Sequence, residues 1–262
     1  MSSPMREKIN VLGVGVDPLT VEELHAEIGR FVEDGRHALV LHANAHGLNL
    51  AHRDPRLRGI LNRARIVFCD GSGVMLAARL LGRRRIPERI TYADWTWKLA
   101  AFAEARGFSL FFLGGRHGVA EKAAGRLKEC FPNLTVAGVH HGYFDRAPGS
   151  PENDAVVREI NAARPDVLLV GFGMPLQEFW LAENWEKVDA SVALTGGAVF
   201  DYVAGELERG PRFLTGHGLE SVARLLVEPR RMWRRYVLGN PLFLFRVLKQ
   251  RLGERGKARG AP

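Results

Sequence analysis

Cysteine is scarce in this chain, and the shortage excludes two classes of protein. Only Cys69 and Cys130 occur among 262 residues, both in apolar surroundings. A disulfide-stapled scaffold needs several paired cysteines, and a cysteine-based zinc site needs ligands at fixed spacing. We therefore expect a globular protein of a reducing cytosol, with one or two domains and a full core.

Long apolar runs are missing as well. No stretch approaches the roughly 18 apolar residues of a membrane-spanning helix. Residues 1–10 lack the apolar centre of a secretory signal peptide. The sequence therefore predicts neither a membrane span nor a leader.

The net charge of +8 is concentrated at one end. Residues 205–262 carry 13 Lys and Arg against five Glu, so residues 1–204 are neutral overall. We expect residues 1–204 to form the main domain and residues 205–262 to form a basic appendage. Such an appendage suits an anionic partner: a phosphate group, a membrane surface or nucleic acid.

Units of apolar run, glycine turn and amphipathic segment repeat along residues 1–204. The expected strands are residues 9–16, 38–41, 109–113, 134–139, 166–171 and 191–194, with another just before Asp70. The expected helices follow a capping box at Thr20 and an Asp54-Pro55 cap, and span residues 74–81, 92–106, 119–129, 151–163 and 179–185. This repetition predicts an α/β fold with a largely parallel, doubly wound, Rossmann-like sheet.

The basic appendage is expected to be helical. Residues 219–227, 230–237 and 242–252 are amphipathic, and Pro229 and the Gly239-Asn240-Pro241 stretch separate them, which predicts three short helices. Their apolar residues either pack on the main domain or touch lipid, as basic amphipathic helices do.

Residues 65–74 contain the candidate general base. A short apolar run predicts a buried strand, and Gly71 and Gly73 then turn the chain into a helix, so Asp70 lies at the strand's carboxyl end. Ligands of open parallel sheets bind at that edge, where Asn44 ends another strand. An Asp that merely caps the following helix fits the same pattern.

Two other motifs follow predicted strands. Gly114, Gly115 and Gly118 stand between a strand and a helix, where backbone N–H groups favour a phosphate, although a plain tight turn fits equally. His140 and His141 are adjacent, but no third ligand stands at zinc spacing, so we expect no metal site.

These groups suit a transfer reaction. Asp70 would take a proton from an attacking hydroxyl while a diphosphate leaves. The leaving charge needs a divalent metal or cationic side chains, and the chain has no Asp-x-Asp triplet, the usual metal-holding motif of such transferases. We therefore expect arginine to serve, with no metal and no cofactor.

Several blocks in a fixed order resemble the WecG/TagA/CpsF glycosyltransferases, glycosyltransferase family 26, over about residues 10–250. The blocks are Asn44 and residues 60–64, 70–74, 114–121, 142–144, 171–178 and 196–205. The resemblance implies an inverting, metal-independent hexosyltransferase. Such enzymes move a sugar, N-acetylmannosamine in the teichoic-acid branch, from a UDP-sugar to a polyprenyl-diphosphate-linked sugar in cell-surface polysaccharide synthesis.

The resemblance also implies a place and a set of residues. The enzyme would be cytoplasmic and peripheral on the inner face of the cell membrane, with its tail on the anionic surface; a homo-oligomer is compatible with this. Asp70 matches the family's proposed general base, with Asn44 and Gln177 beside the substrate. Arginines of the family's appendage, thought to meet the diphosphate, match Arg224, Arg231 and Arg234. Further candidates for substrate contact are Asp94, Gly114, Gly115, Gly118, Gly173 and Glu178.

The donor sugar stays open. The chain has His42 where many members have Thr, Arg209-Gly210-Pro211 where Arg-Ala-Pro is common, and Glu220-Ser221 for a frequent Glu-Trp. Glucosyl and N-acetylmannosaminuronosyl transfer also occur in the family.

Two other functions compete. A dinucleotide-dependent oxidoreductase would use the first glycine turn, but residues 13–17 lack the third glycine and Pro18 follows them. A nucleic-acid-binding module would use the basic tail, which has no recognisable reading motif, so no nucleic-acid partner is expected.

Overall fold

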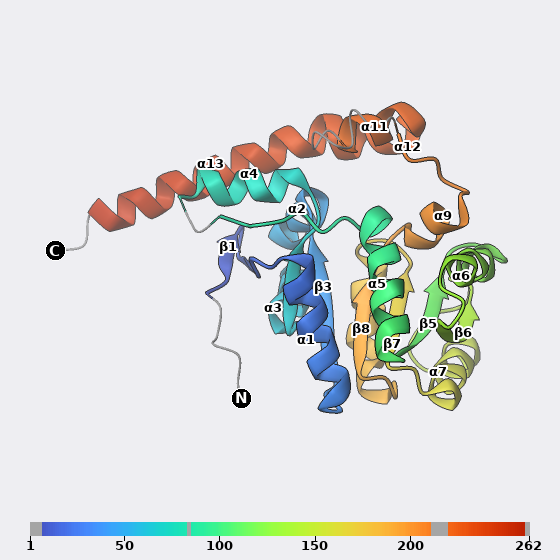
Figure 1. The fold of residues 1–262 in the computed structure, drawn as a ribbon. Coiled ribbons are helices and arrows are strands. Elements are labelled where there is room, and N and C mark those ends of the chain that lie inside the picture. Colours follow the sequence, from blue (N-terminus) through green and yellow to red (C-terminus); the bar gives the residue numbers. More distant parts are fainter. Residues whose placement is uncertain (1–6, 83–84, 211–219, 260–262) are drawn as a thin grey trace. The chain divides into compact units, whose positions relative to one another are not determined.

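The computed structural model describes residues 7–82, 85–210 and 220–259 (Figure 1). Two residues of the sequence predictions lie outside the described residues: Pro211, of the stretch that departs from the family's Arg-Ala-Pro, and Leu219, the first residue of a predicted helix. The chain forms two compact units. The first comprises Met1–Thr20, His42–Ile90 and Arg209–Pro262, and the second comprises Val21–Leu41 and Thr91–Glu208. The basic C-terminal segment thus groups with two N-terminal segments, and a domain boundary at residue 205 stays a prediction.

The main sheet confirms the predicted fold class. Its six strands have the order β4-β3-β8-β7-β5-β6, with bounds β3 (Ala38–Ala43), β4 (Ile66–Cys69), β5 (Ser109–Gly114), β6 (Thr135–His140), β7 (Val167–Gly171) and β8 (Val192–Thr195). Adjacent strands from β3 to β6 pair in parallel. From β5 to β6 the chain adds strands toward one edge of the sheet, and from β6 through β7 to β8 it returns toward the other edge. This reversal of direction is typical of a doubly wound α/β fold.

Helices of the second unit begin and end close to where capping signals place them. They are α1 (Val21–Glu33), α5 (Tyr92–Arg106), α6 (Val119–Cys130), α7 (Pro151–Ala163), α8 (Leu176–Asn184), the 3-10 turn η1 (Trp185–Lys187) and α9 (Val199–Ala204). The Ser150 hydroxyl accepts the Asn153 N–H at 3.1 Å and caps α7, whose first residue is Pro151. Gly107, with φ of 67°, ends α5 in the left-handed conformation.

The first predicted strand is wrong in one respect. Residues 9–16 form a hairpin, with β1 (Ile9–Val11) antiparallel to β2 (Val14–Val16). Leu12 and Gly13 both have positive φ, as a two-residue turn of type I′ requires. The turn leaves the side chains of Ile9, Val11, Val14 and Val16 buried, which is why the segment looked like one continuous strand.

Three further helices of the first unit are α2 (Ala45–Arg53), α3 (Pro55–Arg63) and α4 (Ser72–Leu80). Asp54 caps α3 as predicted, since its carboxylate accepts the Arg56 N–H at 2.8 Å. Helix α2 begins directly after β3, in a segment for which the sequence analysis predicted no element. Asn44 supplies its N-cap.

The prediction of three separate C-terminal helices is also wrong. Helix α11 (Glu220–Val227) ends before Pro229, but α12 (Pro229–Trp233), the π-helical turn η2 (Arg234–Leu238) and α13 (Gly239–Arg259) follow one another directly. Gly239 is helical and its N–H reaches back to the Arg234 carbonyl. We attribute the continuity to this wider turn, which makes room for the ring of Pro241 and for its missing N–H.

Helix α13 packs on its own unit and lies alongside α2 and α4 (Figure 1). Phe243 and Val247 are buried, and the Arg246 guanidinium donates to Asn49 Oδ1 at 2.8 Å. Within the described ranges, no helix combines the length and the apolar character that a membrane crossing needs.

Candidate functional site

Asp70 follows β4 at the carboxyl end of the strand. Its N–H donates to the Ala43 carbonyl at the end of β3, at 2.9 Å. Gly71 has φ of 134°, a backbone angle that glycine adopts readily and other residues rarely do, and α4 begins directly after it. The N-cap of α4 is Gly71, which has no side chain that could cap the helix. The alternative interpretation, in which Asp70 is the cap residue of this helix, is therefore wrong. Its side chain stays 21% exposed.

The surroundings of Asp70 raise its pKa to a value close to neutral pH. Burial raises its pKa from 3.8 to about 6, because the charged form loses hydration. Arg235 opposes this rise most strongly, followed by a hydrogen bond from Asn44 and then by Arg224 and Arg89. A carboxylate with this pKa can accept a proton at physiological pH.

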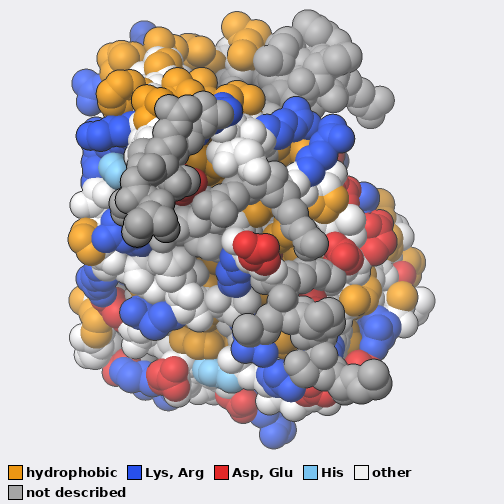
Figure 2. All heavy atoms as spheres, turned by 90° about the vertical axis from the view of Figure 1, so that its left-hand side faces the viewer, with side chains coloured by type: hydrophobic (Ala, Val, Ile, Leu, Met, Phe, Trp, Pro, Cys, Tyr) orange, Lys and Arg blue, Asp and Glu red, His pale blue; other side chains and the backbone are white. Residues whose placement is uncertain are grey.

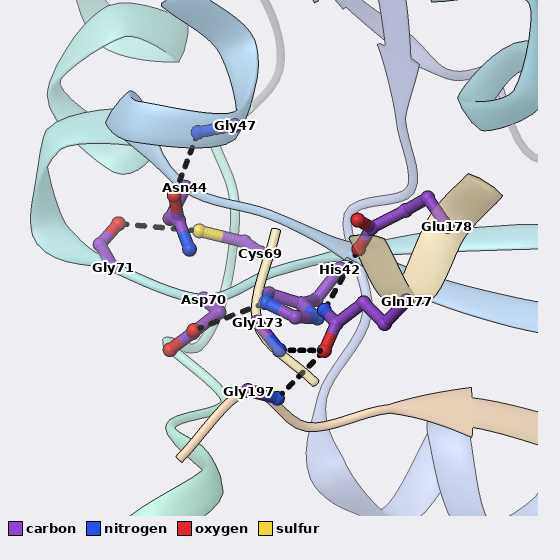
Figure 3. Close-up of polar contacts among 10 residues, drawn as sticks. All are labelled: His42, Asn44, Gly47, Cys69, Asp70, Gly71, Gly173, Gln177, Glu178 and Gly197. Atoms are coloured by element: carbon purple, nitrogen blue, oxygen red, sulfur yellow. Dashed lines mark hydrogen bonds and ion pairs between the residues drawn. The ribbon is translucent and has the colours of Figure 1, made fainter. Parts of the chain in front are cut away.

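Two polar neighbours of Asp70 come from the end of β3. His42 is buried, with Nε2 3.7 Å from Asp70 Oδ2 (Figure 3). Asn44 caps α2, and its Oδ1 accepts the Gly47 N–H at 2.9 Å (Figure 3). Because that bond occupies the oxygen, the amide nitrogen of Asn44 is the group that faces the carboxylate.

The appendage arginines divide into buried and exposed ones. Arg224, on α11, is 17% exposed and lies 3.6 Å from Glu228 Oε2. Arg235 is half-buried in η2. Arg231 is 68% exposed and pairs with Glu228 at 3.0 Å, and Arg234 is exposed, its guanidinium 5.3 Å from the Trp233 ring centroid. The structure thus brings Arg224 into the electrostatic surroundings of Asp70, together with Arg235, which the sequence had not singled out.

Gln177 and Glu178 open α8 in the second unit, and both are fully buried. Gln177 Oε1 accepts the N–H groups of Gly173 and Gly197, at 3.1 and 3.0 Å. Its Nε2 donates to Glu178 Oε1 at 2.8 Å (Figure 3). Burial raises the pKa of Glu178 to about 7, against the opposing hydrogen bonds from Gln177 and from its own backbone N–H. Direct substrate contact by Gln177, Glu178 and Gly173 stays a prediction.

The glycine turn after β5 is shaped by close packing. A Cβ on Gly114 would lie 2.5 Å from the Gly171 carbonyl oxygen, so a side chain cannot fit there. Gly115 and Gly118 have positive φ, and Gly118 is the N-cap of α6. Beside this turn lies a cavity of about 690 Å³, lined by Arg116, His117, Gly118, Val119, Tyr143 and Glu206.

Charged groups at the cavity are partly paired. Glu206 accepts a hydrogen bond from Lys122 Nζ at 2.6 Å and lies 3.8 Å from Arg116 Nη2. Tyr143 is 67% exposed. The His117 and His141 ring centroids lie 3.5 Å apart, yet no group of three His, Cys, Asp or Glu among the described residues could hold a metal ion. The last predicted residue, Asp94, is exposed in the first turn of α5.

The sequence analysis did not single out three residues: Arg89 and Arg235, which act on Asp70, and His46, which lies close enough to Arg235 to feel its charge. Burial and the charge of Arg235 lower the pKa of His46 to about 4, so its imidazole is neutral at physiological pH. The sequence shows an arginine pair at positions 234 and 235, which is compatible with one arginine facing the site. Which of the two is half-buried depends on the π-helical turn, and the sequence does not reveal it. Arg89 lies in an irregular segment, where no periodicity indicates its direction.

Comparisons with known proteins show which family the chain belongs to. The family model described as "Glycosyl transferase WecG/TagA/CpsF family" matches residues 9–257. Proteins of Staphylococcus aureus strains NCTC 8325 / PS 47, COL and MRSA252 are each 27% identical over 244 residues, 92% of this chain and 92% of theirs. Each is named N-acetylglucosaminyldiphosphoundecaprenol N-acetyl-beta-D-mannosaminyltransferase. With nearly its whole length matched, the chain belongs to the WecG/TagA/CpsF family of glycosyltransferases.

Proposed function

We propose that this glycosyltransferase moves N-acetylmannosamine from a UDP-sugar to a polyprenyl-diphosphate-linked N-acetylglucosamine, with inversion at the transferred carbon. The acceptor and the sugar follow from the names of the staphylococcal relatives. The observation that carries the proposal is Asp70, partly exposed at a strand end with a pKa of about 6. In a single inverting displacement, Asp70 takes the proton of the acceptor hydroxyl as its oxygen bonds to the sugar and UDP departs.

The departing diphosphate needs positive charge. Arg224 and Arg235 already act on the carboxylate of Asp70, and a guanidinium fork fits phosphate oxygens. We assign them to the diphosphate, with Arg231 and Arg234 as the further candidates from the family resemblance. Asn44 orients the base through its hydrogen bond.

The second unit has a candidate nucleotide-binding cavity of its own. The cavity beside Gly118 offers the guanidinium of Arg116, the ring of Tyr143 and the carboxylate of Glu206. These groups suit a phosphate, a base and ribose hydroxyls respectively. The turn of Gly114, Gly115 and Gly118 would add backbone N–H groups.

A donor screen tests the function directly. The purified protein is given UDP-N-acetylmannosamine, UDP-glucose or UDP-N-acetylmannosaminuronic acid with a short-chain polyprenyl-diphosphate-N-acetylglucosamine, and products are identified by mass spectrometry. We expect transfer of N-acetylmannosamine, with the opposite anomeric configuration by NMR. Transfer from none of the three, together with binding of NADH in a fluorescence titration, would instead favour an oxidoreductase.

Chelation tests the arginine assignment. If arginines neutralise the diphosphate, EDTA should leave the initial rate of transfer unchanged within about twofold. The assay is run in EDTA and again with added magnesium. A loss in EDTA that magnesium restores would contradict the metal-free mechanism.

We further propose that the C-terminal helices meet the membrane surface on its cytoplasmic side. Several of their large apolar side chains are exposed: Val222, Leu226, Val227, Trp233, Val237, Leu238, Phe245, Leu248 and Leu252. Figure 2 shows apolar side chains gathered beside Lys and Arg on one face of the molecule. Leu238, Phe245 and Leu252 recur every seven residues, so they share one side of a helix.

Two substitutions on that side test the contact. Phe245→Ser with Leu252→Ser removes apolar area without changing charge, and both residues are more than 60% exposed, so the fold should survive. Partition onto vesicles containing anionic lipid, measured by sedimentation, should weaken at least roughly tenfold. Leu176→Ser, at an exposed apolar residue of the second unit, is the matched control. Equal binding by all three proteins would place the membrane contact elsewhere.

A further inference from the structure

Glu178 and Gln177 form a buried hydrogen-bonded arrangement. Gln177 bonds to Glu178 on one side and to the backbone of two glycine turns on the other. We call the arrangement the amide clamp: the carboxyl of Glu178, the amide of Gln177, and the N–H groups of Gly173 and Gly197 (Figure 3). Its three hydrogen bonds are 2.8 to 3.1 Å long, and both side chains are fully buried. All four residues belong to the second unit.

The clamp works only with one orientation of the Gln177 amide. Two N–H groups point at one end of it, so that end has to be the oxygen. The NH₂ end then needs an acceptor, and Glu178 Oε1 is there at 2.8 Å. A reversed amide would set its NH₂ against two N–H donors and its oxygen against the carboxyl. The two N–H groups therefore select the orientation of the amide, and Glu178 supplies the acceptor that its NH₂ end needs.

The second carboxyl oxygen shows which form of Glu178 is present. Oε2 is buried and has no hydrogen-bond partner among residues 7–82, 85–210 and 220–259. A buried oxygen without a partner is far less costly on a neutral acid than on a carboxylate. With the proton on Oε2, Oε1 remains a plain acceptor for Gln177. Charge at position 178 is therefore not needed for the clamp.

The two turns lie where substrates of such folds bind. Gly173 follows β7 and Gly197 follows β8, and these strands are parallel neighbours. Both glycines have positive φ, 83° and 58°, and neither has a side chain that could anchor its turn. The Gln177 oxygen ties one turn to the other, in addition to the backbone bond from the Gly196 N–H to the Val170 carbonyl at 2.8 Å.

We infer that Glu178 is a positioning residue, which acts through Gln177 to fix the spacing of the turns after β7 and β8. The clamp itself follows from the geometry of the second unit. Its effect on sugar transfer rests on the proposed function and on the expectation that Gln177, Glu178 and Gly173 contact the substrate. Displacing a substrate-positioning group by about an ångström can cost roughly 100-fold in rate.

The test compares two replacements of similar size. Glu178→Gln keeps an oxygen for the Gln177 amide, whereas Glu178→Met keeps the volume without an acceptor. Hydrogen exchange of the Gly173 and Gly197 amides, followed in full-length protein by mass spectrometry, should be unchanged in E178Q. It should be roughly 10- to 100-fold faster in E178M. Peptides from α1 report whether the whole protein has loosened. If E178M does not fold, Glu178→Asp, which withdraws the carboxyl by one methylene, takes its place.

Kinetics then separate positioning from other roles. We expect kcat/KM for transfer to fall roughly 100-fold in E178M and to recover within about threefold of wild type in E178Q. Equal exchange in wild type and E178M would overturn the clamp. Loss of protection or activity in E178Q equal to that in E178M would also overturn it, since charge would then be required. If the exchange contrast holds while no sugar is transferred from any donor, the proposed function fails and the clamp stands.

Discussion

Replacing Asp70 by Asn should lower the rate of sugar transfer by roughly 100- to 10,000-fold, the usual contribution of a positioned general base. The amide is close in size to the carboxyl but cannot take a proton from the attacking hydroxyl. Donor binding should persist, which the fluorescence of the five tryptophans can report. Asp189→Asn, an exposed position at which the same chemical change is made, should leave the rate unaltered. Full activity in D70N would remove Asp70 from the mechanism.

The role of Asp70 as a base also predicts how the rate of transfer changes with pH. A base acts only when ionised, and burial raises the pKa of Asp70 to about 6. The wild-type rate should therefore fall about tenfold per unit as pH drops below about 6. Residual activity of D70N should show no such acid limb. A wild-type limb near pH 4 would mean that the base is a different, unperturbed carboxylate.

The raised pKa also makes Asp70 costly to the fold. A carboxyl that binds its proton more tightly in the folded state contributes stability below pH 3.8 that is lost as pH rises through about 6. At pH 7, D70N should therefore be more stable than wild type by up to about 3 kcal/mol, and the difference should vanish near pH 3.5. Urea unfolding at both pH values measures it. A D70N protein less stable than wild type at pH 7 would show that the carboxylate is structural.

Local rules predicted the second unit well because its signals are short-range. Ser150-Pro151 and Gly107 mark helix ends by capping chemistry, and the predicted bounds of α5 agree with the structure. The failures lie where a distant contact decides. Residues 9–16 show strand-like alternation, and only the positive φ at Leu12 and Gly13 turns them into a hairpin. Pro241 looked like a helix breaker, and the π-helical turn before it accommodates the ring.

The site shows the same division. The position of Asp70 at a strand end could be predicted, because an apolar run followed by glycines specifies it. Its pKa could not, since that depends on burial and on Arg235, 165 positions further along the chain. Likewise, the family blocks single out Gln177 as a candidate for substrate contact. Its hydrogen bonds to two turns could not be predicted, because they depend on how the chain folds.

Replacing Arg235 by Ala should lower kcat/KM roughly 100-fold, as the loss of one group that stabilises developing charge does. It should also move the acid limb of the pH profile upward. Arg235 is the strongest charge holding down the pKa of Asp70, so its removal raises that pKa above about 6. In Arg235→Lys, the acid limb should return to its wild-type pH, because an ammonium keeps the charge. Only part of the rate should return, because lysine lacks the planar fork of the guanidinium. Arg230→Ala, at an exposed arginine of α12, should change neither.

The neighbouring arginine makes this experiment decisive about the C-terminal helices. Resemblance to the family points to Arg234, which is exposed, whereas the π-helical turn leaves Arg235 half-buried. In an uninterrupted α-helix, adjacent residues lie about 100° apart around the axis, so only one of the two can face Asp70. If R235A moves the limb and R234A does not, the turn at Arg234–Leu238 sets the charge on the base. If R234A alone moves it, the family match was the better guide, and these residues take a different register when the enzyme works.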